Sequence, residues 1–182
     1  MKQINTYINE KLHLSTKNTY TCQPNSKDEL KEIIIQRIED EGHNCDLNDI
    51  DTSKITDMSC LFYTSKFESD YTIFKNFNGD ISMWDVSNVE NMRWMFYQCK
   101  KFNCDLSRWN VSNVKDMEGT FNRCGVFNCD LSKWNVSNVL DMNYMFYNCE
   151  EFDCNLSKWD VSNVKTMDGA FEHCPTQPTW YK

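Results

Sequence analysis

The chain repeats itself every 25 residues over most of its length. Four stretches, which begin at residues 77, 102, 127 and 152, align without gaps. Each carries the same four residue types in register, and these columns consist of Trp84, Trp109, Trp134 and Trp159; Met92, Met117, Met142 and Met167; Phe96, Phe121, Phe146 and Phe171; and Cys99, Cys124, Cys149 and Cys174. Such short units cannot bury their apolar residues alone, so the repeat predicts a stack with a continuous core between neighbours.

A weaker fifth copy precedes the four regular ones. Ile50 stands at its tryptophan position, while Met58 and Phe62 keep the methionine and phenylalanine positions. The spacing from Met58 to Met92 is 34 residues instead of 25. We therefore expect the nine additional residues, 68–76, to form a loop that bulges from the first unit.

The hydrophobic period changes inside each unit. Phe102, Cys104 and Leu106 alternate with polar residues, which is typical of a strand with one buried face. From Val114 to Cys124, apolar residues recur at steps of three and four, which predicts a helix of about three turns. The sequence thus predicts an α/β parallel solenoid of about five rungs, each a strand, a turn and a helix.

The segments at either end lack the repeat. The pattern from Ser26 to Glu29 is a capping box and Gly42 is a helix stop, so an amphipathic capping helix is expected between them. At the other end, prolines prevent a further regular rung, and Trp180 and Tyr181 are expected to fold back over the last core. The predicted organisation is a tail with a short amphipathic segment (1–25), a capping helix (26–42), rungs 1 to 5 (43–76, 77–101, 102–126, 127–151 and 152–174, together 43–174) and a C-terminal tail (175–182).

Composition narrows the classes of function. The net charge of −8 argues against nucleic acid as a partner, because phosphate binding needs concentrated Lys and Arg. No stretch approaches the length of a membrane span or a signal peptide, so we expect no membrane insertion and a cytoplasmic protein, with the cell surface as the alternative. In that compartment the ten cysteines are expected to be reduced.

One string carries a family resemblance. It reads WDVSNVENMRWMFYQC from Trp84 to Cys99 and recurs with small changes from Trp109, Trp134 and Trp159. It resembles the BspA-like surface-protein repeat family, a divergent branch of the leucine-rich repeats. The resemblance covers roughly residues 27–174 and implies a leucine-rich-repeat-like solenoid. Many relatives are surface proteins associated with adhesion, and the resemblance implies no catalytic residues.

Two columns have a chemical interpretation beside a structural one. The cysteine ladders could hold a soft metal, but their spacing of one per rung and the absence of a histidine column favour packing. The column of Asp46, Asp80, Asp105 and Asp130 could attract a cation, yet no calcium-loop pattern is present and turn hydrogen bonds are favoured. We expect neither a metal nor a cofactor, and no enzyme motif occurs.

Function is expected to lie where the rungs differ. With the phenylalanines at 77, 102, 127 and 152 as position 1, positions 18 and 21 alternate between bulky and small residues, which indicates either interdigitation or an aromatic surface. We predict a non-enzymatic protein-interaction or structural module, with an adhesin-type protein as the alternative, an unidentified protein as partner and self-association through the last rung as a second contact. The predicted partner-binding residues are Arg93, Trp94, Tyr97, Arg123, Tyr144, Tyr147 and His173. The invariant outward face of the predicted strands is the alternative binding surface, for a repetitive polymer or another copy of the chain.

Overall fold

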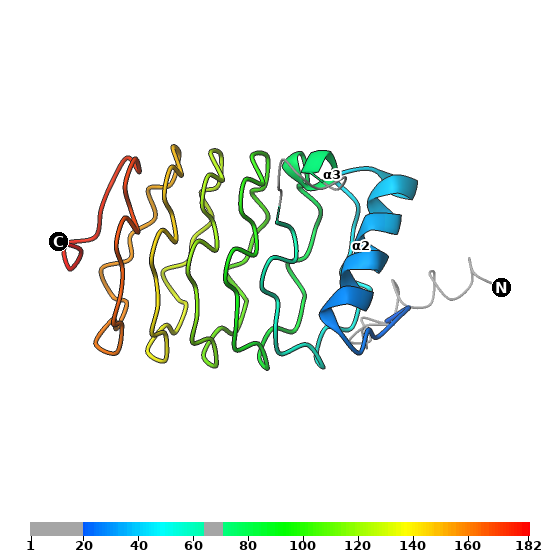
Figure 1. Cartoon of the computed structure of the whole chain (residues 1–182), viewed down its shortest axis with the longest axis horizontal. Coiled ribbons are helices and arrows are strands. Elements are labelled where there is room, and N and C mark those ends of the chain that lie inside the picture. Colours follow the sequence, from blue (N-terminus) through cyan, green and yellow to red (C-terminus); the bar gives the residue numbers. More distant parts are fainter. Residues whose placement is uncertain (1–19, 64–70) are drawn as a thin grey trace, which may run out of the picture.

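The repeats stack one on another as flat rungs along a single axis (Figure 1). The computed structural model describes residues 20–63 and 71–182. Two helices are present in these residues: α2 spans Lys27–Glu41 and covers the first rung, and α3 spans Tyr71–Lys75. The amphipathic segment expected near the N-terminus lies outside the described residues.

The predicted rung of strand, turn and helix is wrong. Neither helix lies in the four regular rungs, and in the described part of the chain the pairing between rungs is limited to isolated parallel bridges, such as those from Asn91 to Asp116 and from Asp116 to Asp141. The described residues form no parallel sheet, so the fold is not the expected leucine-rich-repeat-like solenoid. The insertion in rung 1 also differs from the expected loop, because it contains α3.

Each rung consists instead of a succession of turns that leads into the next rung. Within one rung, the amide groups of Trp109, Val114, Thr120 and Cys124 donate to the carbonyl oxygens three residues earlier. Asp or Asn side chains at positions 4, 9 and 15 fix further turns, because each accepts a hydrogen bond from the amide two residues ahead. Asp105, for example, accepts from the amide of Ser107 at 2.9 Å. The spacing of three and four residues therefore arises from successive turns.

Backbone hydrogen bonds join the rungs along one side. In rung 2 the amides at positions 16, 18, 20 and 22 donate to carbonyl oxygens at positions 15, 17, 19 and 21 of rung 3, as from Trp94 to Glu118 at 2.8 Å. The same pattern joins rungs 3 and 4 and rungs 4 and 5. Positions 18 and 22 have positive φ in each regular rung. These left-handed residues turn the chain where a helix would have continued straight.

Aromatic columns form the core between rungs. The indoles of Trp84, Trp109 and Trp134 are stacked and nearly parallel, with ring centroids 6.5 Å apart between neighbours. Neighbouring rings in the Phe96 column are only 5.2–5.5 Å apart. Because equivalent rings are almost parallel, these distances report the local rise per rung. The rungs therefore spread apart toward the tryptophan side, and Figure 1 shows them spreading away from α3.

The ends of the stack are covered by non-repeating elements. α2 begins at the N-cap Ser26, whose hydroxyl accepts from the amide of Glu29, and it buries Leu30, Ile34 and Ile38. At the C-terminus the indole of Trp180 stacks on Trp159 at 6.4 Å and donates to the carbonyl oxygen of Leu156. The rung tryptophans make this same bond to the preceding rung, so Trp180 takes the place of the next member of their column.

Candidate interaction surface

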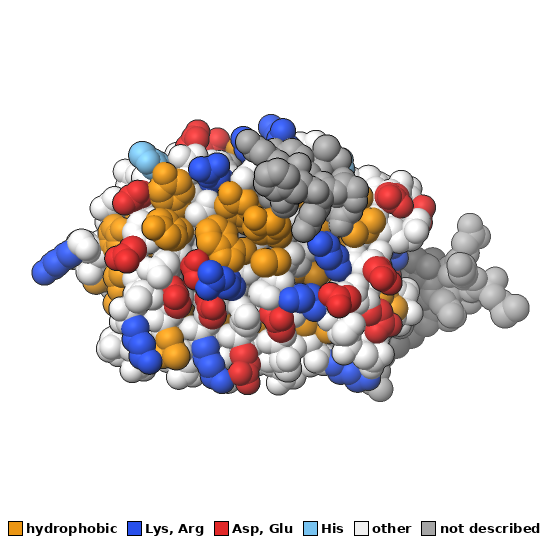
Figure 2. Space-filling view, viewed as in Figure 1, with side chains coloured by type: hydrophobic (Ala, Val, Ile, Leu, Met, Phe, Trp, Pro, Cys, Tyr) orange, Lys and Arg blue, Asp and Glu red, His pale blue; other side chains and the backbone are white. Residues whose placement is uncertain are grey.

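Aromatic side chains emerge on the side of the stack that carries the backbone ladder. They come from positions 18 and 21 of rungs 2 and 4, namely Trp94 and Tyr97, then Tyr144 and Tyr147. Tyr144 is 41% exposed. Figure 2 shows hydrophobic side chains gathered in the upper part of one face, with basic and acidic side chains around them. We call Trp94, Tyr97, Tyr144 and Tyr147 the aromatic face.

The members at position 18 lie on glycines of the next rung. A Cβ atom built on Gly119 would lie 2.5 Å from the ring of Trp94, and one built on Gly169 would lie 2.7 Å from the ring of Tyr144. Large and small residues therefore interdigitate between rungs, as one of the two sequence interpretations held. Trp94 and Tyr144 have φ of 56° and 54°, in the left-handed region that costs a side-chain-bearing residue about 1–2 kcal/mol.

The members at position 21 hold these rings in place. Tyr97 packs edge-on against Trp94, with centroids 5.1 Å apart, and stacks on Tyr63 at 4.9 Å. Tyr147 packs edge-on against Tyr144 and against His173. The predicted binding residues Trp94 and Tyr97 are thus in contact, as are Tyr144, Tyr147 and His173. Tyr63 belongs to the same cluster and was missed, because its rung lacks the full motif.

The two predicted arginines occupy different surroundings. Arg93 forms a two-point ion pair with Glu118 of the next rung. Partial burial raises the pKa of Glu118 above its ordinary value, although the Arg93 charge acts in the opposite direction. Arg123 lies one rung further on and lines a trough instead. Arg93 therefore flanks the aromatic face as a paired cation, and Arg123 belongs mainly to the neighbouring edge.

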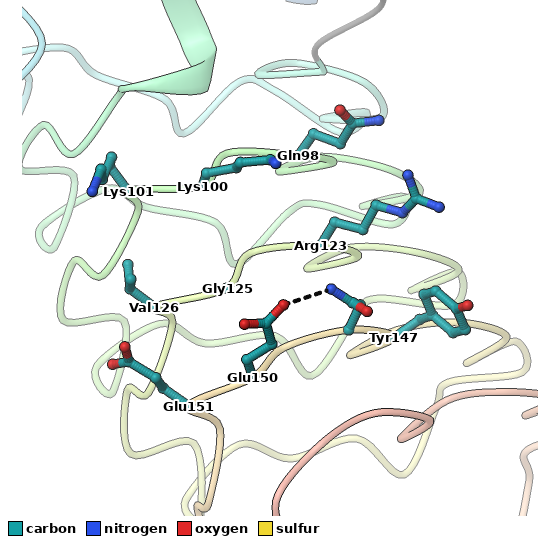
Figure 3. Close-up of a pocket in the computed structure, with 10 residues that line it drawn as sticks. Gln98, Lys100, Lys101, Arg123, Gly125, Val126, Tyr147, Glu150 and Glu151 are labelled. Carbon is teal, nitrogen blue, oxygen red and sulfur yellow. Dashed lines mark hydrogen bonds between the residues drawn. The ribbon is translucent and has the colours of Figure 1, made fainter.

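The trough has a volume of about 460 Å³ and crosses the edge of rungs 2, 3 and 4 (Figure 3). Its floor is Gly125, where an added Cβ would meet nothing within 4 Å. Lys100 and Lys101 lie on one side of that floor and Glu150 and Glu151 on the other. Sequence reasoning missed these residues, although the change from Lys-Lys to Gly-Val to Glu-Glu at positions 24 and 25 was visible.

Comparison with known proteins places the repeats in a family. A family model described as Mycoplasma protein of unknown function, DUF285, matches residues 36–76 and 66–179, which is most of the chain. The chain belongs to this family. Searches of curated proteins and of solved structures found no match.

In this DUF285 member, one column of cysteines hydrogen-bonds neighbouring rungs to each other. The thiols of Cys99, Cys124, Cys149 and Cys174 each donate to a backbone carbonyl oxygen of the preceding rung at 2.9–3.2 Å. Burial raises the pKa of the Cys99, Cys124 and Cys149 thiols well above the ordinary value, so they are not thiolates at neutral pH. All ten cysteines are unpaired with one another.

In this DUF285 member, the side chains of the aspartate and asparagine columns also form hydrogen bonds with backbone groups. Asp80, Asp105 and Asp130 accept from the serine amide two residues ahead. The Asn113 amide donates to the carbonyl oxygen of Ser87 in the preceding rung, and the next two rungs repeat this bond. Among the residues described, no group of three or more His, Cys, Asp or Glu has the arrangement of a metal site.

No helix in the described residues of this DUF285 member could cross a membrane. Neither α2 nor α3 combines the length and apolar character that a membrane-crossing helix needs.

Proposed function

We propose that this protein is a non-enzymatic interaction module whose protein partner contacts the aromatic face. The finer assignment to the BspA-like repeats belongs to this proposal and rests on the motif from Trp84 to Cys99. Arg93, Arg123 and His173 extend the proposed contact around the four aromatic residues. Tyr, Trp and Arg are the residue types that contribute most to protein interfaces.

The observation that carries the proposal is the backbone conformation of Trp94 and Tyr144. Position 18 is glycine in rungs 3 and 5, where positive φ has no steric cost. Rungs 2 and 4 keep bulky rings there, and Tyr144 remains substantially exposed. Residues held in sparsely populated backbone conformations cluster at functional sites.

The invariant columns support a module without catalysis. Carboxylates at position 4 are engaged by turn amides, and burial raises the pKa of the Cys99, Cys124 and Cys149 thiols well above the ordinary value. A nucleophile needs a lowered pKa or an adjacent base, and these groups have the opposite surroundings. The residues that vary between rungs at the surface are therefore the better candidates for function.

The experiment compares two double variants in capture of partners from the native source. Tyr97→Asn with Tyr147→Asn removes two rings of the aromatic face, and Asn122 shows that position 21 accepts asparagine. Asp105→Asn with Asp130→Asn is the matched control on the other side of the rung, where Asn155 already forms the same turn. Thermal unfolding verifies that both variants are folded.

The proposal expects the tyrosine pair to lose a partner that wild type and the aspartate pair retain. Retention of that partner by the tyrosine pair, with loss by the aspartate pair, would transfer binding to the opposite, invariant side. Location is tested separately by protease treatment of intact cells of the native source. Protection supports the proposed cytoplasmic location, and rapid cleavage supports the adhesin-type alternative.

A further inference from the structure

Positions 24 and 25 of three successive rungs form a charge pattern with an internal symmetry. They are Lys100 and Lys101 in rung 2, Gly125 and Val126 in rung 3, and Glu150 and Glu151 in rung 4. All four charged residues are exposed. Figure 3 shows the lysines and the glutamates on opposite sides of the bare floor at Gly125.

These four charges form no salt bridge among the described residues, although salt bridges occur elsewhere in the stack, as between Arg37 and Asp49. Glu150 accepts one neutral hydrogen bond from the Asn148 amide. The edge therefore presents a positive and a negative pair to the solvent, each one rung away from the same glycine.

A second copy of the chain is complementary to this edge in one orientation. A two-fold axis that passes beside Gly125, lies in the plane of contact and runs at right angles to the stack axis exchanges rung 2 with rung 4 and brings each lysine pair against the glutamate pair of the other copy. The interface is isologous, so both sets of opposite charges are matched at once. A parallel arrangement in register would instead place lysine against lysine, which disfavours it.

We propose that the protein forms an antiparallel homodimer through this edge, with Lys100 and Lys101 of each copy facing Glu150 and Glu151 of its partner. This inference rests on the charges of the edge and not on the aromatic face, although Tyr147 and Arg123 of the proposed partner contact also line the trough. The pairs lie at the rims of the two troughs, which together enclose a channel above Gly125. Since exposed ion pairs are weakened by salt, the dimer dissociates as ionic strength rises.

The test uses charge reversal and mixing, with mass in solution measured by sedimentation equilibrium over a concentration series. Lys100→Glu with Lys101→Glu makes the edge wholly acidic, and Glu150→Lys with Glu151→Lys makes it wholly basic. Each variant alone is expected to dimerise about a hundredfold or more weakly than wild type. An equimolar mixture restores both sets of opposite charges, so a dimer with one copy of each variant is expected. Lys133→Glu with Lys158→Glu, at exposed position 7, changes net charge equally and is expected to leave the wild-type dimer intact.

Four results overturn the proposal. They are a wild-type protein that stays monomeric, reversal variants that still dimerise, a mixture that remains monomeric, and a position 7 control that dissociates like the others. Near-ultraviolet circular dichroism of the stacked tryptophans verifies that each variant is folded. A monomeric wild type would leave the edge to a different partner and would not affect the capture experiment on the aromatic face.

Discussion

The indole of Trp94 lies directly on Gly119 of the following rung, so close that glycine is the one residue without a clash there. The backbone at Gly119 also has φ of 60°, which glycine adopts without strain. Two separate constraints therefore act at this position, one from the ring and one from the backbone. Single and double substitutions can distinguish them.

Gly119→Ala is expected to lower the free energy of unfolding by about 2–5 kcal/mol, from left-handed strain and overpacking together. In a Trp94→Gly background the same change should cost only the strain, about 1–2 kcal/mol. Urea unfolding of the four proteins gives the coupling energy. Gly125→Ala is the control, because its Cβ meets open space, and equal costs in both backgrounds would show that the ring contact is unimportant.

Trp180 is expected to stabilise the last rung as the tryptophans stabilise the others. Trp180→Ala removes the stacking on Trp159 and the bond to Leu156, and should cost about 2 kcal/mol, less than the roughly 3–5 kcal/mol of a fully buried tryptophan. Trp180→Phe keeps an aromatic ring but loses the bond, and should cost about 1 kcal/mol. Hydrogen exchange should be fastest in rung 5 of the alanine variant. Unchanged exchange there would mean that the tail does not protect the stack.

The cysteines are expected to differ strongly in reactivity. Alkylation of the native protein at neutral pH should modify exposed Cys60 first and should reach Cys99, Cys124 and Cys149 only on unfolding. Their pKa values are raised by burial, so the reactive thiolate is scarce. Mass spectrometry of time points gives the order. Under denaturing, non-reducing conditions nearly all ten thiols should react, and recovery of only a few, or stoichiometric zinc, would contradict this.

Acid should destabilise the stack through its turn aspartates. Hydrogen bonds from Ser107, Ser132 and Ser162 lower the pKa values of Asp105, Asp130 and Asp160, so the folded protein binds protons less readily than the unfolded chain. The stability that these aspartates contribute is present at pH values above their pKa in the unfolded chain, about 3.9. It is lost as the pH falls through their lowered pKa values in the folded protein.

The triple variant Asp105→Asn, Asp130→Asn and Asp160→Asn keeps the turn hydrogen bonds but removes the three carboxyl groups that titrate. Its free energy of unfolding should therefore fall less steeply with acid than that of wild type, in urea titrations between pH 6 and pH 3. Parallel slopes for the two proteins would assign acid sensitivity to other carboxylates.

The repeat could be predicted from sequence, whereas the path of the chain within a rung could not. The three- and four-residue spacing from Val114 to Cys124 fits a helix, but successive turns with bonds to the third preceding residue produce the same spacing. The contrary signal was Gly119, which recurs as Gly169 in the middle of the predicted helix and marks a left-handed position. Trp94 and Tyr144 obscured it, because bulky residues rarely adopt that conformation.

The candidate surfaces were predictable to different degrees. Variation between rungs drew attention to Tyr97 and Tyr147, since a surface residue that departs from a strict repeat is visible in the alignment. The trough was not visible in this way, because its floor is a missing side chain at Gly125 and its sides lie 25 residues away in each direction. Only stacking brings those positions together.

The unequal spacing of the aromatic columns also decides how such an array grows. Each added rung of the same kind advances further on the side of Trp109 than on the side of Phe121, so it tilts relative to the rung before it. A longer array would follow an arc rather than a straight rod. The number of rungs then sets the angle between whatever is attached to its two ends.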